Sequence, residues 1–176
     1  MYTVEKFEKT IDIKKYIEGY VNVKEFEEFC KECPNYGKVW SCPPYDFDAE
    51  KYWEKFSEIS IFAYKINFTE DVSKEESYQI LKEVKKTMSE ELFQLEEITS
   101  GAESLSAGSC HLCQGEGCTR PQGGACRHPQ KMRYSIESIG GNVGLTVRKL
   151  MGIELEWIDE GKVPSYFVLV GGLLKK

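Results

Sequence analysis

The chain of 176 residues has 41% hydrophobic and 30% charged side chains, which is typical of a globular protein with one domain. Its net charge of −6 disfavours nucleic acid as a partner, because a polyanion would be repelled overall. The longest apolar run, residues 167–174, is far shorter than the ~20 residues of a membrane span, and residues 1–10 lack the apolar core of a signal peptide. We therefore expect a cytoplasmic protein that binds neither membranes nor nucleic acid.

The first third of the chain predicts one strand followed by helices. Residues 2–11 are expected to form the strand, and apolar side chains at helical spacing predict a helix over residues 13–20. Asn22 is placed to cap a second helix, which ends at the breakers in CKECPNYG. After the turn-rich SCPPYDFD, Asp48 is placed to cap a short helix that reaches about Ser57.

The middle of the chain predicts a buried strand and a long helix. Residues 59–68, ISIFAYKINF, are apolar on both faces, which indicates a central strand. Ser73 and Glu76 match a capping box, and apolar residues follow at steps of three or four from Tyr78 to Leu95. We expect this stripe to face the core and the charged back of the helix to be solvated surface.

The last third predicts short elements around a cysteine-rich segment. A short strand over residues 102–107 leads into that segment, and Pro129 is placed to start a helix that continues to Ile139. Asn142 is placed to cap another helix. A terminal hairpin is expected from residues 153–157 and 166–170.

This order of elements predicts an α/β (α+β) fold in which helices pack on a mixed β-sheet. The chain contains no clear repeat, low-complexity tract or long linker. A single domain spanning residues 1–176 is therefore expected.

All seven cysteines fall in two short windows, which we call the first cysteine loop (residues 30–45) and the second cysteine loop (residues 108–129). The first contains Cys30, Cys33 and Cys42, and the second contains Cys110, Cys113, Cys118 and Cys126. An odd number of cysteines cannot pair completely within one molecule, and thiols stay reduced in the cytosol. Clustering of this kind predicts metal binding or redox chemistry.

The second cysteine loop offers four thiolates in a short, glycine-bearing segment, which matches the Cys₄ ligation of an iron–sulfur cluster, with [4Fe–4S] as the expected form. The first loop offers three thiolates and leaves three alternatives. It holds a cluster with an open or non-cysteine position, or zinc with His111 or His128, or it shares ligands with the second loop. Two further alternatives remain open. The two CxxC pairs could close one zinc site, or Cys110 and Cys113 could act as redox thiols without metal.

Positive charge accompanies the second cysteine loop in an otherwise acidic chain. Arg127, Lys131 and Arg133 are expected to stabilise the negative charge of a thiolate-bound centre. His128 and His111, the only histidines, are candidates to bind the metal or to hydrogen-bond a sulfur. The cofactor-binding residues predicted beside the cysteines are therefore Arg127, His128 and Arg133.

The leading functional hypothesis is electron transfer or redox service to a partner protein. The alternatives are a zinc-binding structural module and an iron–sulfur enzyme that uses an open coordination position. No catalytic acid–base pair is evident. Tyr36, Asp46 and Glu137 are available, but we expect the two carboxylates to be ordinary surface groups.

These cysteine loops resemble those of domain-of-unknown-function family 2284, a family of predicted metal-binding proteins. The similar stretches are CKECPNYGKVWSCPP and AGSCHLCQGEGCTRPQGGACRHPQKMRYSIESIGGNV. The resemblance implies a soluble bacterial or archaeal protein that binds metal as iron–sulfur, with the seven cysteines as its ligand set. It places Arg127, Pro129, Arg133, Ser135 and Glu137 in the accompanying signature, while Tyr134 stands where the family usually has proline.

Overall fold

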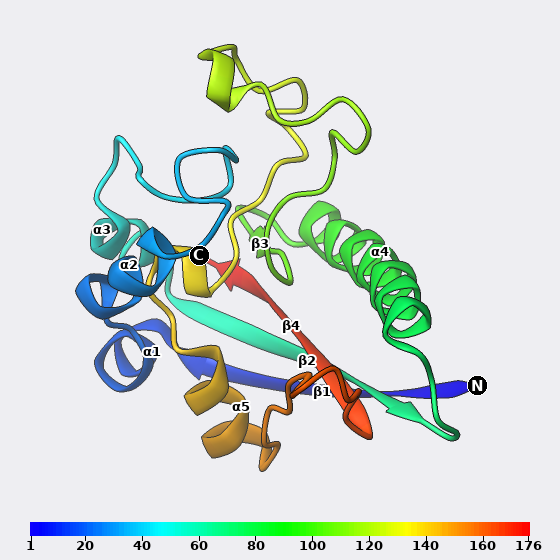
Figure 1. Cartoon of the computed structure of the whole chain (residues 1–176). Coiled ribbons are helices and arrows are strands. Elements are labelled where there is room, and N and C mark those ends of the chain that lie inside the picture. The colour runs from blue at the N-terminus through cyan, green and yellow to red at the C-terminus, as the bar shows by residue number, and fades with distance from the viewer.

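Four strands form one antiparallel sheet in the computed structural model, which describes residues 1–176 (Figure 1). The strands are β1 (Tyr2–Asp12), β2 (Glu58–Phe68), β3 (Glu103–Leu105) and β4 (Tyr166–Lys175), and their order in the sheet is β1-β2-β4-β3. The predicted α+β class is confirmed, and β2 has the expected central position.

The sheet is antiparallel throughout, whereas a mixed sheet was expected. The last residue of β1, Asp12, pairs with the first residue of β2, Glu58. The chain therefore enters β2 at the same end of the sheet at which it left β1. The helices between these strands do not carry it across to the opposite end. Parallel pairing occurs only at one isolated bridge, between Ser106 and Ser135.

Five α-helices and two short 3₁₀ helices complete the fold. They are α1 (Ile13–Tyr20), α2 (Val23–Lys31), α3 (Ala49–Trp53), α4 (Lys74–Ile98), η1 (Arg120–Gln122), η2 (Glu137–Ile139) and α5 (Val143–Met151). The caps predicted at Asn22, Asp48 and Asn142 are all present, and Ser73 forms the expected capping box with Glu76. No helix combines the length and the apolar character needed to cross a membrane.

Helices cover both faces of the sheet, with α4 on one face and α1, α3 and α5 on the other (Figure 1). Alternate residues of β2 explain this arrangement, because successive side chains of a strand point to opposite faces. Ile59 and Ile61 pack in the core that contains Trp53, whereas Tyr64 and Ile66 pack in the α4 core. The apolar run of β2 thus supplies both cores, as its sequence predicted.

Two predicted elements in the last third are absent. Residues 129–131 form only a turn and η2 is a single 3₁₀ turn, so the helix expected from Pro129 was wrong. The backbone between them is extended and the Ser106 N–H donates to the Tyr134 carbonyl at 2.8 Å, which a helix would not permit. The terminal hairpin was also wrong, because β4 pairs with β2 over ten residues while residues 153–157 form no strand.

Candidate metal centre

The two cysteine loops lie together at one end of the molecule (Figure 1). The first follows the carboxyl end of α2, where Cys30 is the penultimate helical residue. The second leaves the sheet after β3 and extends outward, and none of residues 108–129 is buried. Since the second loop has no core of its own, its position depends on polar contacts with the first.

Arg120 is the main contact between the loops. Its guanidinium donates hydrogen bonds to the backbone carbonyls of Val39 at 3.0 Å, Cys42 at 2.5 Å, and Pro44. The same group lies 5.2 Å from the centre of the Trp40 ring, a cation–π arrangement. One side chain of the second loop therefore fixes the backbone of the first on both sides of Cys42.

Further hydrogen bonds join the loops around the cysteines. The indole N–H of Trp40 donates to the Thr119 hydroxyl and to the Gly124 carbonyl, both at 3.1 Å. The backbone N–H of Cys110 donates to the hydroxyl of the buried Ser41 at 3.0 Å. These bonds place the first cysteine of the second loop next to the residue that precedes Cys42.

All seven thiols are free, and none lies in the hydrophobic core. Cys33 is exposed and the other six are half-buried. Burial raises the pKa of Cys30 to about 11, and negative charge on Cys42 and Cys33 raises it further. Charge on the other two thiols of the first cysteine loop thus reaches Cys30.

The same electrostatic contact crosses between the loops at Cys42 and Cys110. Burial raises the pKa of the Cys42 thiol above its usual value, and charge on Cys33 and Cys110 acts in the same direction. The pKa of Cys110 is raised by burial and then by Cys126 and Cys113. A cation or a positively charged cluster would relieve this mutual repulsion, because it stabilises the thiolate form.

No three histidine, cysteine, aspartate or glutamate side chains are arranged around a position for a single metal ion. Four thiolates on one zinc ion would have their sulfurs about 3.8 Å apart, from a Zn–S bond of about 2.3 Å. A [4Fe–4S] cluster holds its cysteine sulfurs farther apart, because each cysteine binds a different iron. The seven thiols are chemically suited to bind a metal, although no three of them surround a single-ion position in this structure.

Of the predicted cations, Arg127 lies among the thiols of the second loop. It donates to the Gly117 carbonyl at 2.6 Å and faces Glu116 at 3.6 Å. A hydrogen bond with Cys113 raises the pKa of Arg127, and charge on Glu116 and Cys118 adds to the effect. Arg127 is therefore positioned to offset negative charge on two of the four thiols.

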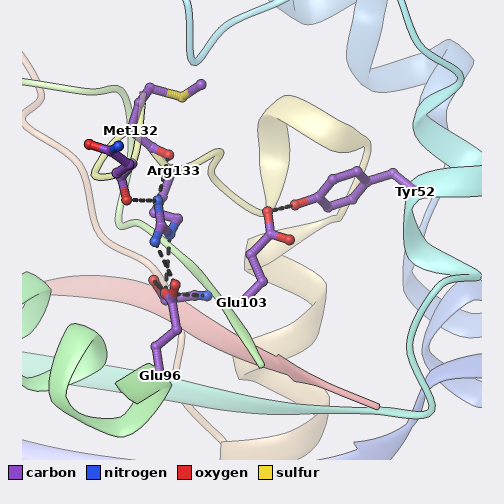
Figure 2. Close-up of polar contacts among 7 residues, drawn as sticks. Tyr52, Glu96, Glu103, Met132 and Arg133 are labelled. Atoms are coloured by element: carbon purple, nitrogen blue, oxygen red, sulfur yellow. Dashed lines mark hydrogen bonds and ion pairs between the residues drawn. The ribbon is translucent and has the colours of Figure 1, made fainter. Parts of the chain in front are cut away.

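Arg133 is directed instead toward α4, where it pairs with Glu96 (Figure 2). Its Nε and Nη2 atoms donate to the two carboxylate oxygens of Glu96 at 3.1 and 2.5 Å, and its guanidinium lies 5.2 Å from the Phe93 ring. A surface depression of about 680 Å³ adjoins this pair and is lined by no cysteine. The structure thus brings Arg127 to the thiols but assigns Arg133 a partner elsewhere.

The two histidines and Lys131 make few contacts. His111, His128 and Lys131 are all exposed. Partial desolvation of its ring, followed by the positive charge of Lys85 and Lys82, lowers the pKa of His111. The structure brings neither histidine into a group with three cysteines.

Lys85 is a cation of the site that the sequence analysis missed. It belongs to α4, yet its ammonium donates to the Ser109 carbonyl at 2.6 Å. Burial lowers the pKa of Lys85 to about 8, while charge on Cys110, Glu137 and Cys42 opposes that shift. The available signal was its position four residues after Leu81 and three before Met88, where a lysine interrupts the apolar stripe.

Glu137 was expected to be a surface carboxylate, and this expectation was wrong. Its Oε2 atom is the one buried side-chain oxygen or nitrogen in the structure without a hydrogen-bond partner. Burial raises the pKa of its carboxyl group above the usual value. Asp46, in contrast, is exposed as expected, and Tyr36 is half-buried.

Comparison with known proteins agrees with a metal-binding class. The chain matches the model of a family described as "Predicted metal-binding protein (DUF2284)" over residues 16–174. The chain therefore belongs to this family, which confirms the resemblance carried by its cysteine loops. No curated protein and no solved structure matches the chain.

Proposed function

We propose that the two cysteine loops hold an iron–sulfur centre, with [4Fe–4S] as the expected form. The observation that carries this proposal is that all seven thiols of the chain lie on two loops that are bound to each other by Arg120 and Trp40. Free cysteine that serves only as a small apolar residue would be buried in the core. Here the core contains no cysteine.

Different residues of the chain would bind such a centre and stabilise its charge. Cys110, Cys113, Cys118 and Cys126 are the proposed ligands in the second cysteine loop, and Cys30, Cys33 and Cys42 those in the first. Arg127 offsets negative charge beside Cys113. Trp40 joins the loops through its indole N–H, and its ring would limit the access of water to a centre bound there.

Electron transfer to a partner protein in the cytoplasm is the proposed use of the centre. When bound, an iron–sulfur cluster supplies a one-electron couple whose potential depends on net charge, hydrogen bonds to sulfur and solvent exposure. Support comes from the half-buried thiols, the exposed Cys33 and the position of both loops at one end of the molecule (Figure 1). A partner would approach that end without displacing the sheet or its helices.

A zinc-binding structural module is the second candidate, favoured by the second cysteine loop itself. That loop has no buried residue, and glycines with positive φ at residues 108, 115, 117 and 123 give it a specific path. A bound metal contributes folding energy to a segment of this kind that lacks a hydrophobic core. The iron–sulfur enzyme remains a third possibility and requires an open position in the first loop.

Metal analysis of protein purified without oxygen separates these candidates. We expect iron and acid-labile sulfide in equal amounts, and visible absorption that bleaches reversibly on reduction by dithionite. Zinc without iron, in a colourless protein that loses structure on chelation, would support the structural module instead. Protein that contains no metal after reconstitution with iron and sulfide would overturn the proposal.

A further inference from the structure

β1 is an edge of the sheet, and one side of its backbone is unpaired (Figure 1). The strand pairs with β2 only, because the order in the sheet is β1-β2-β4-β3. None of its 11 residues is buried, whereas β2, which has a neighbour on each side, alternates buried and half-buried residues. A long exposed edge of this kind can accept a further strand, so proteins either protect it or use it for binding.

The outward-facing backbone groups of β1 follow from the hydrogen bonds at the two ends of the β1–β2 ladder. The N–H of Thr69 donates to the Met1 carbonyl at 3.1 Å, and the N–H of Ile13 donates to the Ser57 carbonyl at 2.9 Å. In an antiparallel pair, every second residue bonds to the neighbouring strand and the others point away from it. The odd-numbered residues of β1 therefore bond to β2, and its even-numbered residues present their N–H and C=O groups to the open side.

The charged side chains in the middle of β1 form a pattern that is complementary to itself. Residues 5–9 read EKFEK. If two copies of β1 pair antiparallel about a two-fold axis at Phe7, Glu5 of one copy faces Lys9 of the other. Lys6 likewise faces Glu8. Every cross-strand pair of charges then joins opposite signs on the same face of the sheet, which stabilises a strand pair.

The charges and the backbone select the same register. A shift by two residues in one direction places Lys6 opposite Lys6 of the second copy, and the opposite shift places Glu8 opposite Glu8. A shift by one residue pairs even-numbered with odd-numbered residues, whose backbone groups already bond to β2. The register centred on Phe7 thus combines opposite charges with free donors and acceptors on both copies.

The surface beside this edge is open to a partner. Glu8 and Lys9 are exposed and enter none of the ion pairs within the chain. A depression of about 600 Å³ borders β1 on the α4 face, where its lining includes Lys6, Glu8 and the apolar Ile98. Ile98 is 81% exposed. An approaching strand therefore meets unpaired charges and apolar surface without displacing any part of the chain.

We propose that two copies of the chain pair through β1, in the register centred on Phe7, and form one continuous antiparallel sheet with two-fold symmetry. Charged edges commonly prevent unwanted strand addition. Here the same charges disfavour other registers and accept a second copy of β1. The second cysteine loop follows β3, at the opposite edge of the sheet, so the inference does not depend on metal binding.

Sedimentation equilibrium of the reduced, metal-free full-length protein tests whether the dimer exists. We expect the mass to approach twice the 20.2 kDa of one chain as the concentration rises. Added salt should weaken the dimer, because it screens ion pairs at an exposed edge. Protein that remains monomeric over the whole concentration range would overturn the inference.

Two charge-exchange variants test the register without changing composition or net charge. Glu8→Lys with Lys9→Glu makes every cross-strand pair in the homodimer a pair of like charges, and so does Glu5→Lys with Lys6→Glu. We expect each exchange to weaken its homodimer by about 100-fold. An equimolar mixture of the two variants should form a heterodimer, because all of its pairs join opposite charges. A mixture of folded variants that stays monomeric would overturn the register.

Lys86→Glu with Glu90→Lys is the matched control, since it exchanges charges at exposed positions of α4 and should dimerise as the parent does. Circular dichroism checks that each variant folds. The exchange at Lys6 also removes its ion pair with Glu91. If that variant does not fold, Glu8→Pro replaces it, because the N–H it removes faces the open side and is used only in the dimer. Glu8→Pro should be monomeric. Dimers that persist in every variant would show that another surface is used and would overturn the inference.

Discussion

The sheet with its helices and the pair of cysteine loops are held together by different physical means. The sheet is covered on both faces, and its central strand contributes fully buried side chains such as Ile61 and Ile66 to the two cores. The second cysteine loop has no buried residue and depends on Arg120, Trp40 and backbone hydrogen bonds. Burial of apolar side chains dominates the first region, whereas polar contacts between the loops hold the second.

The largest effect is expected for Trp53→Ala in the core. Trp53 is fully buried and its indole N–H donates to the Ile139 carbonyl at 2.8 Å, so its removal leaves both a cavity and an unpaired carbonyl. We expect a loss of about 3–5 kcal/mol in the free energy of unfolding. Trp157→Ala is the control, since Trp157 is 74% exposed, and should change stability by less than ~0.5 kcal/mol. Urea unfolding measures the free energy of unfolding of both variants. Equal losses would contradict the stated difference between the buried core and the exposed surface.

A smaller effect is expected for Glu96→Gln, which removes the charge that pairs with Arg133 (Figure 2). Burial alone would raise the pKa of Glu96, but hydrogen bonds from Arg133 and Ser104 hold it below the usual value. A carboxyl with a depressed folded-state pKa stabilises above its unfolded pKa and loses this contribution as pH falls through the folded value.

The unfolding free energy of Glu96→Gln should accordingly be about 2 kcal/mol lower at pH 7. The difference from the parent protein should shrink below pH 4.5, the ordinary value for glutamate. Glu97→Gln, at the exposed neighbouring position, is the matched control and should show no such pH dependence. A difference that grows on acidification would contradict the assigned direction.

Arg120→Ala should act on the cysteine loops and not on the sheet. It removes the donors to Val39, Cys42 and Pro44 and the contact with Trp40. We expect the thiols of the metal-free protein to react with an alkylating reagent about 10-fold faster, which corresponds to about 1.4 kcal/mol of local opening. Arg148→Ala, on the exposed face of α5, is the control. Unchanged reactivity would mean that the loops are held together by other contacts.

The smallest effect on the fold is expected for Cys113→Ser combined with Cys118→Ser. Both residues lie in the loop that contributes nothing to either core, so metal-free stability should change by less than ~0.5 kcal/mol. Iron content after reconstitution should nevertheless fall by at least the share bound in the second loop. A large loss of metal-free stability would show that the loop supports the sheet, contrary to the comparison.

Elements specified by local chemistry were predictable from the sequence. The caps at Asn22, Asp48, Ser73 and Asn142 and the apolar run of β2 depend on residues next to one another in the chain, and each is present. Elements that depend on distant partners were not predictable. The helix expected after Pro129 is replaced by extended chain that bonds to Ser106.

The candidate site likewise combines residues that the sequence identified with residues that it did not. Spacing along the chain placed the seven cysteines in two loops, and the structure brings those loops into contact. Lys85 belongs to α4 and Glu137 to η2, and the spacing of the cysteines did not identify either residue as a neighbour of the thiols. A lysine within an apolar stripe was the only signal for Lys85, and for Glu137 the signal was its place in the signature that the family resemblance implied.

The order of strands has a consequence for biosynthesis. β4, residues 166–175, lies between β2 and β3, and β3 joins the sheet only through β4. Both cysteine loops therefore leave the ribosome well before the strand that holds the end of the sheet together, and their thiols remain unprotected during that interval. A centre of the kind proposed would therefore be inserted into a completed sheet only after β4 has been translated.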